Sequence, residues 1–396
     1  MSGNFKMLAK TFYGFEPILA RELRNLGADH VQEGVRNVTF EGDTGFMYKA
    51  NLCLRTALKI FKPIASFRVF NEKDLYQNVY RINWPGYFGH DKTFAIDTTM
   101  HSEVFNNSLF VSQKVKDALV DKFRAVDRQR PSVNTQDPDI RINVHLYKNF
   151  CTVSLDSSGS SLHQRGYRIS TNIAPINEVL AAGLLLSSGW DGQTDFLDPM
   201  CGSGTFLIEA GMIACNIPVN INRENYAFMS WEDYDAELYQ KIVDASLNKT
   251  REFHHKIIGF DKAPSAVRKA QENVDNANLS EYISIERKDF FRTEKPVDSK
   301  LHMVFNPPYG ERLQIDMEDL YGRIGDTLKQ QYPATDAWLI TSNLEALKHV
   351  GLRPSRKIKT YNGKLESRLV KYEMYAGSKR EKFKTSSNNT ENPPRN

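Results

Sequence analysis

The feature that most constrains this chain is a strand, a glycine-rich turn and a helix at residues 194–210, T-D-F-L-D-P-M-C-G-S-G-T-F-L-I-E-A. This order is typical of the first crossover of a doubly wound α/β sheet, where ligands bind beyond the carboxyl ends of the strands. Gly202 and Gly204 would let a ligand approach the backbone closely, although a tight turn with no ligand has the same composition. No Gly-Lys-Ser/Thr follows, so the turn is not a P-loop.

A second strand, Leu301–Phe305, runs into Asn306-Pro307-Pro308-Tyr309. The two prolines hold the backbone extended and remove two N–H donors, which leaves carbonyl oxygens and one amide side chain in fixed positions. Asn306 and the Pro307 carbonyl could accept the hydrogens of an amine on a flat ring, and Tyr309 could stack on that ring. For the tetrapeptide alone, a strand terminator with a packing Tyr would be the favoured interpretation; because it follows the glycine turn in the same chain, we favour the amine site.

Two acidic residues follow the intervening strands. Asp261 ends the strand 256–260, where a carboxylate can accept hydrogen bonds from the hydroxyls of a ribose, or else cap the next helix. Asp289 follows the strand 283–285 and could accept an adenine amino group beside Phe290, or else lie in a surface turn. The interval from the glycine turn to Asp261 is far longer than the roughly 20 residues of an NAD-binding fold, which argues against a dehydrogenase.

Together these motifs resemble those of S-adenosylmethionine-dependent methyltransferases that act on exocyclic amines of nucleobases. The chain from about residue 5 to 376 is similar to the THUMP-domain RNA guanine-N2 methyltransferases, a family that includes enzymes acting on 23S rRNA and others acting on tRNA. The resemblance implies S-adenosylmethionine as the cofactor and the N2 amine of a guanine, most plausibly in 23S rRNA, as the acceptor. A tRNA enzyme, an adenine-N6 DNA methyltransferase and a non-catalytic RNA-binding assembly factor stay open as alternatives.

The predicted site residues fall into two groups. The predicted catalytic residues are Asn306, Pro307, Pro308 and Tyr309. The residues predicted to bind the cofactor are Pro175, Asp198, Cys201, Gly202, Ser203, Gly204, Thr205, Asp261, Asp289, Phe290 and Asn306. The role of Pro175 comes from the resemblance alone, in which a helix starting at residues 172–175 closes over the methionine end of the cofactor.

The front of the chain is more basic than the rest. Residues 1–170 carry 23 Lys and Arg against 17 Asp and Glu, or +6, whereas residues 171–396 carry 29 against 31, or −2. A basic front fits a polyanion-binding region attached to a cofactor domain, although it is also compatible with ordinary surface solvation. The candidates for RNA binding lie on an amphipathic helix at 108–126, just after it, and in a linker expected to be exposed: Lys114, Lys116, Arg124, Arg130, Arg165 and Arg168.

The fold predicted from these patterns is α/β, with a seven-stranded Rossmann-like methyltransferase sheet preceded by an α+β region. The expected divisions are a ferredoxin-like domain at 1–60, a THUMP domain at 61–156, a linker at 157–171, the methyltransferase domain at 172–376 and a disordered basic tail at 377–396. No apolar run reaches the length of a membrane span, and the four scattered cysteines indicate neither a metal site nor disulfides. We expect a cytoplasmic protein; the oligomeric state is not indicated.

Overall fold

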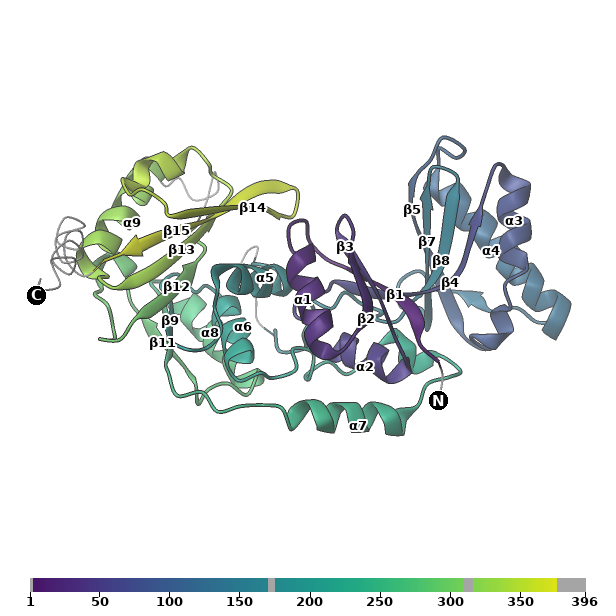
Figure 1. Cartoon of the computed structure of the whole chain (residues 1–396), viewed down its shortest axis with the longest axis horizontal. Coiled ribbons are helices and arrows are strands. Elements are labelled where there is room, and N and C mark those ends of the chain that lie inside the picture. Colours follow the sequence, from purple (N-terminus) through teal and green to yellow (C-terminus); the bar gives the residue numbers. More distant parts are fainter. Residues whose placement is uncertain (1–2, 170–174, 309–315, 376–396) are drawn as a thin grey trace, which may run out of the picture. The chain divides into compact units, whose positions relative to one another are not determined.

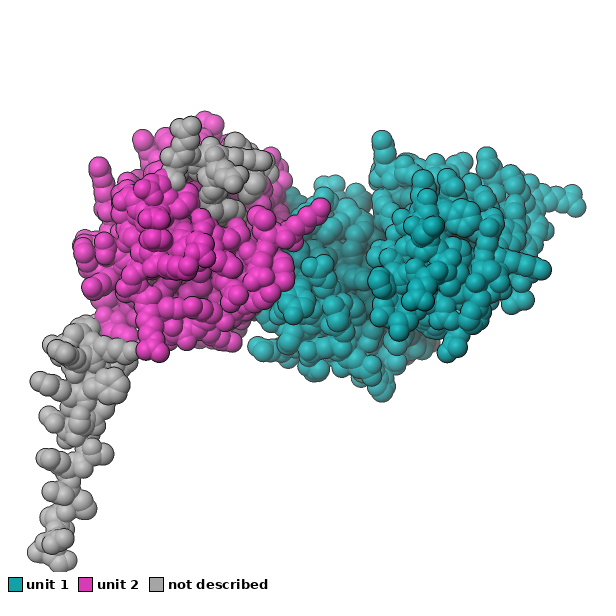
Figure 2. All heavy atoms as spheres, turned by 90° about the horizontal axis from the view of Figure 1, so that it is seen from above, with its two compact units in different colours: residues 1–166, 218–249 teal, residues 167–217, 250–396 magenta. Residues whose placement is uncertain are grey.

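The computed structural model describes residues 3–169, 175–308 and 316–375 (Figure 1). They form two compact units, one of residues 1–166 and 218–249 and the other of residues 167–217 and 250–396 (Figure 2). The chain first passes between the units at Gly166–Tyr167, inside the stretch expected to be a linker. None of the described helices is long and apolar enough to cross a membrane.

The first unit is built on an eight-stranded sheet with the order β2-β3-β1-β4-β8-β7-β5-β6. Its strands are β1 Phe5–Lys10, β2 Asp29–Glu33, β3 Asn37–Gly42, β4 Lys59–Arg68, β5 Thr93–His101, β6 Ser132–Val133, β7 Ile140–Tyr147 and β8 Phe150–Asp156. The helices are α1 Glu16–Leu26, α2 Thr44–Cys53, α3 Glu72–Tyr80 and α4 Ser108–Asp127. The helix α4 matches the amphipathic helix predicted at 108–126, and β7 and β8 match strands that the sequence pattern predicts at 140–146 and 151–155. The elements β2, β4, β6 and α3 were not predicted, because their short or irregular patterns lack a clear period.

The insertion at residues 218–249 also folds into the first unit, whereas the sequence analysis counted it with the methyltransferase domain. It contains the helix α7, Ala236–Leu247, and packs its aromatic rings on α2. The ring centroids of Tyr48 and Phe228 lie 4.5 Å apart, and the Asp235 amide donates to the Tyr48 hydroxyl at 3.1 Å. Burial of these rings explains why a largely polar insertion packs in the first unit, although the sequence on both sides of it belongs to the second unit.

The second unit contains a seven-stranded sheet with the order β11-β10-β9-β12-β13-β15-β14. Its strands are β9 Asp195–Asp198, β10 Ile257–Asp261, β11 Ile283–Arg287, β12 Leu301–Phe305, β13 Thr335–Thr341, β14 Arg356–Asn362 and β15 Leu365–Met374. The first five are parallel, and β14 and β15 form an antiparallel hairpin at one edge. This is the doubly wound sheet that the sequence predicts.

The order of the strands in this sheet predicts where a ligand would bind. Going along the chain, the sheet grows from β9 to one side through β10 and β11, and then restarts on the other side of β9 with β12. The point where the order reverses lies between β9 and β12, and ligands in open α/β sheets bind at the carboxyl ends of the strands there. Every residue of β9 and β12 is buried, as expected for parallel strands covered on both faces.

The helices of this unit are α5 Glu178–Ser188, α6 Thr205–Ala214, α8 Pro264–Asn276 and α9 Met317–Gln331. The expected start of α5 at residues 172–175 is wrong as far as it can be seen: Pro175 lies before the helix, and residues 170–174 are outside the described ranges. The helix begins at Glu178 because the side chain of Asn177 accepts a hydrogen bond from the Leu180 amide and caps it.

Candidate functional site

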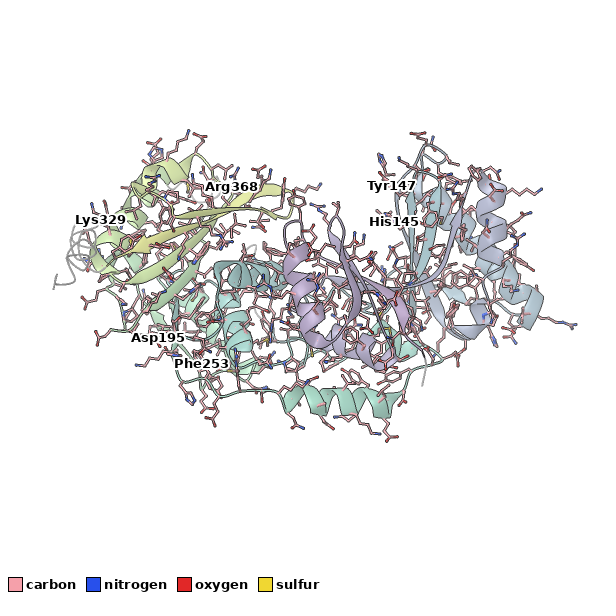
Figure 3. The ribbon with its side chains drawn as sticks, viewed as in Figure 1. His145, Tyr147, Asp195, Phe253, Lys329 and Arg368 are labelled. Carbon is pink, nitrogen blue, oxygen red and sulfur yellow. The ribbon has the colours of Figure 1, made fainter. Side chains whose placement is uncertain are left out.

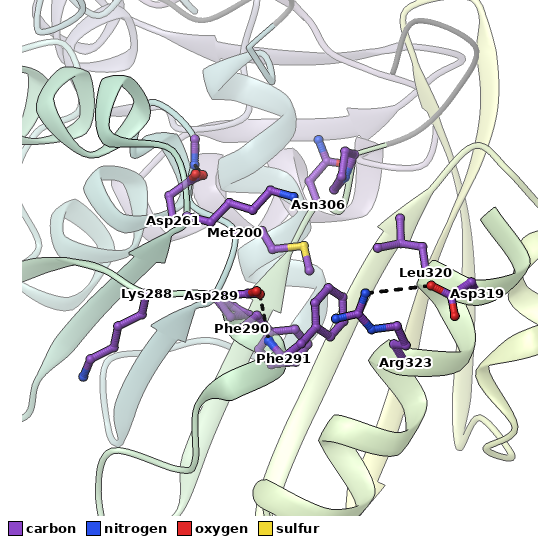
Figure 4. Close-up of a pocket in the computed structure, with 14 residues that line it drawn as sticks. Met200, Asp261, Lys288, Asp289, Phe290, Phe291, Asn306, Asp319, Leu320 and Arg323 are labelled. Atoms are coloured by element: carbon purple, nitrogen blue, oxygen red, sulfur yellow. Dashed lines mark hydrogen bonds and ion pairs between the residues drawn. The ribbon is translucent and has the colours of Figure 1, made fainter. Parts of the chain in front are cut away.

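A pocket of about 450 Å³ opens in the second unit beyond the carboxyl ends of β9, β10, β11 and β12 (Figure 4). Its lining combines the turns after these strands with one face of α9. The lining residues are Pro199, Met200, Gly202, Asp261, Lys262, Lys288, Asp289, Phe290, Phe291, Asn306, Pro308, Asp319, Leu320 and Arg323. Five of the residues predicted for the cofactor therefore meet in one cavity: Gly202, Asp261, Asp289, Phe290 and Asn306.

The glycine turn forms the wall of the pocket after β9. Gly202 and Gly204 have φ values of 56° and 81°, a left-handed conformation that favours glycine. At Gly204 a Cβ atom would also come within 3.3 Å of the Ala270 side chain on α8, so the helix packs directly against the turn. The backbone at Gly202 thus borders the pocket without a side chain in the way.

Asp261 joins the ends of two strands. Its Oδ2 accepts a hydrogen bond from the Gly202 amide at 3.0 Å, and its Oδ1 accepts one from the Ala263 amide at 2.9 Å. The second bond fixes the chain entering α8, but the N-cap residue of α8 is Ala263 and no side chain caps the helix, so the capping alternative is wrong. Each carboxylate oxygen keeps a further lone pair, and the side chain lines the pocket. The contact with a ribose stays a prediction.

On the opposite side of the pocket, Asn306 follows β12 and carries an unusual oxygen. Its Oδ1 is buried and has no hydrogen-bond partner among the described residues. An unsatisfied buried acceptor costs about 1–3 kcal/mol, so it marks a position where a ligand donor is expected. Pro308 lines the pocket and Pro307 is buried beside it. Tyr309 lies outside the described residues, so its stacking role stays a prediction.

Asp289 and the two phenylalanines after it form the floor. Asp289 accepts a hydrogen bond from the Phe291 amide at 3.2 Å, which caps a short 3-10 turn at Phe290–Arg292. The Phe290 ring packs into the core against Phe305 and Tyr332, with centroids at 5.9 and 5.5 Å. Phe291 is the more accessible ring, so a flat ligand group would meet it as readily as Phe290.

The sequence analysis missed the α9 wall. The Arg323 guanidinium lies 4.0 Å from the centroid of the Phe291 ring and 3.8 Å from the Asp319 carboxylate (Figure 4). Arg323 therefore covers one face of a pocket ring. No motif in the sequence predicts that α9 lines the pocket, because its amphipathic pattern is typical of any surface helix.

The other residues predicted for the cofactor support the pocket from behind or lie away from it. Asp198, Cys201, Ser203, Gly204 and Thr205 are buried. Pro175 is exposed and does not line the pocket. Burial raises the pKa of the Cys201 thiol well above its usual range, so the thiol stays protonated and is no nucleophile.

Arg168 supports this turn from the side. Its guanidinium donates to Glu178 Oε1 at 2.7 Å, to Thr205 Oγ1 at 2.9 Å and more loosely to Ser203 Oγ at 3.4 Å. It also donates to the Ile176 carbonyl at 3.2 Å. One largely covered cation therefore ties the segment before α5 to the glycine turn, and its role as an RNA contact on an exposed linker is not what the structure shows.

The expectation of exposure is also wrong for Arg165, whose side chain is only 1% exposed and donates to the Leu162 and Arg55 carbonyls. Gln164-Arg165-Gly166 read as a linker because charge and glycine usually mark a surface. The four remaining candidates, on or just after α4, are at the surface. Lys114 pairs with Glu72, Lys116 with Asp117 and Arg124 with Asp121, while Arg130 is exposed.

The site suits a nucleoside cofactor better than a metal. Its polar groups include one amide oxygen and three carboxylates, those of Asp261, Asp289 and Asp319, around a partly apolar cavity. Within the described ranges no group of three or more His, Cys, Asp or Glu side chains could hold a metal ion. The open glycine backbone, the strand-end acid and the free Asn306 oxygen are the features that such a cofactor and its substrate need.

Comparison with known proteins agrees with this geometry. Residues 165–371 match the family model described as RMKL-like, methyltransferase domain. The chain belongs to this methyltransferase family. Residues 70–156 match the THUMP domain, and residues 6–61 match the ferredoxin-like domain of RlmL. S-adenosylmethionine is accordingly the cofactor, and the sequence predictions of family, fold and cofactor are confirmed.

Individual relatives extend the match over nearly the whole chain. A Synechocystis protein, whose name proposes an RNA methyltransferase, is 36% identical over 91% of this chain and 95% of its own length. The ribosomal RNA large subunit methyltransferase K/L of Shewanella amazonensis is 37% identical over 95% of this chain, which spans 54% of that protein. A crystal structure of a methyltransferase candidate with S-adenosylhomocysteine has a TM-score of 0.84 and 29% identity, and covers 96% of this chain and 100% of its own.

We predict that Asp198→Asn removes a pH-dependent loss of stability in the cofactor-free protein. Burial raises the pKa of the Asp198 carboxyl well above its usual range, and the nearby Asp261 charge adds to the rise. A raised folded-state pKa gives stability below the unfolded value of about 4, which is lost as pH rises through the folded value. Thermal unfolding should therefore show the variant gaining on the wild type between pH 4 and pH 8.

The exposed acid Glu281 provides the control for this measurement, since Glu281→Gln should track the wild type at every pH. An unfolding difference between Asp198→Asn and the wild type that stays constant across the range would contradict the assignment.

We also predict that Arg168→Ala loosens the glycine turn and weakens cofactor binding. The change leaves the Glu178 carboxylate buried without its partner, and breaking a buried pair in this way typically costs about 3–5 kcal/mol. Amide hydrogen exchange at residues 202–205 should accelerate in the cofactor-free protein, and calorimetry should show at least a roughly tenfold loss of S-adenosylhomocysteine affinity. Arg268→Ala, at an exposed ion pair on α8, is the matched control; equal behaviour of both variants would refute the role.

Proposed function

We propose that this protein transfers a methyl group from S-adenosylmethionine to the exocyclic N2 amine of a guanine in RNA, with 23S rRNA as the substrate. The observation that carries the proposal is the buried Asn306 Oδ1, which has no partner among the described residues and borders the same pocket as Gly202 and Asp261. A buried acceptor beside a cofactor site suits a substrate that brings an N–H donor.

The choice of RNA rests on the domains that precede the site. The chain carries a match to the THUMP domain, and relatives that align over most of it are named for the large ribosomal RNA. Those relatives are about twice as long as the aligned part, so the activity and substrate of the whole relative are proposed here, not transferred. A solved TrmN structure with 18% identity and a TM-score of 0.68 shares the fold and favours no tRNA substrate by itself.

The chain's own residues would perform three tasks. Gly202, Asp261 and Asp289 would hold the cofactor, which supplies a methyl group on a sulfonium centre when bound. Asn306 Oδ1 and the Pro307 carbonyl would accept the two hydrogens of the amine. An amine on an aromatic ring is a poor nucleophile because its lone pair is delocalised, and two acceptors favour the pyramidal nitrogen whose lone pair is available.

Orientation of the substrate would account for much of the rate of methyl transfer. When the enzyme holds the nitrogen in line with the methyl group, a bimolecular step becomes effectively unimolecular, and this can lower the activation free energy by about 7–11 kcal/mol. The rigid Asn306-Pro307-Pro308 backbone suits this purpose, because the prolines allow little change in φ. The target base has to leave its stack to enter the pocket, as bases do in other enzymes that modify them. Tyr309 stays the predicted stacking partner.

The test is Asn306→Ala on an unmodified 23S rRNA transcript, with an unmodified tRNA pool assayed in parallel. Loss of a group aimed at the reacting centre typically lowers turnover about 10²-fold or more. We expect that loss in turnover, with S-adenosylhomocysteine affinity changed little. Asn248→Ala, an exposed position at the end of α7, should behave as the wild type.

Two outcomes would count against the proposal. Methylation that survives Asn306→Ala within about threefold would remove Asn306 from the chemistry, since such a change is far below the effect of a catalytic contact. If nucleoside analysis found N6-methyladenosine as the product, guanine N2 would not be the acceptor. If the methylated product appeared only in the tRNA pool, 23S rRNA would not be the substrate.

A further inference from the structure

One face of the sheet in the first unit is open at the end where β7 leads into β8. Along β7 the residues alternate: Ile142, Val144 and Leu146 are buried in the core that includes α4, whereas the residues between them point to the other side. Figure 3 shows two of these, His145 and Tyr147, projecting from β7. Among the described residues, both are exposed.

Near the end of this open face, four strands place their exposed residues in one line. Arg68 on β4 is paired with Phe150 on β8, Phe150 with Tyr147 on β7, and Tyr147 with His101 on β5. Residues paired across strands have side chains on the same face of a sheet. Arg68, Phe150, Tyr147 and His101 therefore form a continuous row, here called the aromatic row, which spans three strand spacings or about 14 Å.

The aromatic row is held in place by the backbone around it. The turn between β7 and β8 is fastened to both neighbouring strands: the Lys148 amide donates to the His101 carbonyl at 2.7 Å, and the Val69 amide donates to the Asn149 carbonyl at 2.8 Å. Ser102 Oγ also donates to the Lys148 carbonyl. A surface fixed in advance loses less conformational entropy when it binds a ligand.

The chemistry of the row combines flat rings with positive charge. Tyr147 is 53% and Phe150 47% exposed, so each ring offers about half of its surface to a ligand. The His101 and Tyr147 rings lie nearly parallel with centroids 5.9 Å apart, and Lys148 Nζ lies 5.8 Å from the Tyr147 centroid. Arg68 lies at the other end of the row, and none of its four positions holds a carboxylate.

Cross-strand ring contacts alone would stabilise a sheet. That explanation accounts for the pairing of Tyr147 with His101, but it favours rings that cover one another and not two rings that each keep about half of their surface in water. Exposed rings bordered by cations are the surface that unpaired nucleotides require, because bases stack on the rings while the phosphates meet the positive charge. Four-stranded RNA-binding sheets use such rings to stack two or three bases.

We propose that the aromatic row binds unpaired nucleotides of single-stranded RNA. The inference rests on the proposed function in that the substrate is RNA, and it adds which part of the substrate the first unit contacts. Paired RNA hides its base faces in the helix, so the row selects a single-stranded segment of the substrate. The basic surface of α4 lies on the covered side of the sheet and takes no part in this contact.

The test measures fluorescence anisotropy of the full-length protein with a labelled single-stranded RNA of randomised sequence and with a labelled blunt RNA duplex. The wild type should bind the single strand more tightly. Tyr147→Ala and Phe150→Ala should each weaken single-strand binding roughly tenfold, as loss of one stacking ring does, and leave duplex binding nearly unchanged. Tyr147→Phe keeps the ring and should retain the wild-type affinity.

Phe110→Ala is the matched control, because Phe110 is a partly exposed ring on α4, on the covered side of the sheet. Thermal unfolding of every variant shows whether a loss of binding comes from a loss of folding, and Tyr147→Phe keeps the test valid if an alanine variant unfolds. Equal affinity of folded Tyr147→Ala, Phe150→Ala and wild type for the single strand would overturn the proposal. So would equal losses for single strand and duplex, or dimerisation of the wild type that Phe150→Ala abolishes.

The outcome is separable from that of the proposed function. Methylation of the rRNA transcript together with unaltered single-strand binding by the row variants would refute only the aromatic row. Absence of methylation of any RNA, together with ring-dependent binding of the single strand, would refute the reaction and leave the binding surface standing.

Discussion

The hydrogen bond from the Gly202 amide to the Asp261 carboxylate is the contact on which the site depends. It joins the ends of β9 and β10 and holds the glycine turn at the edge of the pocket. The same carboxylate also accepts from the Ala263 amide just before α8, so one side chain connects the turn, the strand end and the start of the helix. Arg168 braces the turn from the other side through Thr205 and Glu178.

Across the pocket the arrangement is different. In the glycine turn the amides of Cys201, Gly202 and Gly204 donate to protein acceptors, whereas Asn306 keeps a buried oxygen without a partner among the described residues. A protein of marginal stability retains such a cost where function needs it. The two sides of the site therefore differ. The side with the glycine turn and Asp261 is already ordered by hydrogen bonds and would hold the cofactor, whereas Asn306 on the other side offers an acceptor for a donor from the substrate.

Sequence motifs identified the residues that touch the pocket through backbone or strand ends, including Gly202, Asp261 and Asn306, because the doubly wound topology brings these positions together. They could not identify Arg323, which reaches the pocket only through the packing of α9. The sequence also failed to predict which charged side chains are covered by the protein. Arg165 and Arg168 read as exposed cations, yet their guanidinium groups are satisfied by carbonyls, hydroxyls and a buried carboxylate that lie elsewhere in the sequence.

The first unit shows the same limit of prediction from sequence, here for contacts between whole segments. The pattern of residues 140–146 and 151–155 predicts two strands, but only the pairing register reveals that Phe150, Tyr147 and His101 lie side by side. In the same way, the aromatic residues of 218–249 were visible in the sequence, while their destination on α2 was not. Contacts between distant segments depend on topology, which a single sequence specifies only indirectly.

The most direct test of the central claim is nucleoside mass spectrometry on rRNA and tRNA purified from cells that lack this gene, from the parent cells and from cells complemented with the wild-type gene. The account predicts that N2-methylguanosine falls in 23S rRNA of the deletion strain, stays constant in tRNA, and returns with the wild-type gene. Unchanged N2-methylguanosine in both RNA classes would contradict it.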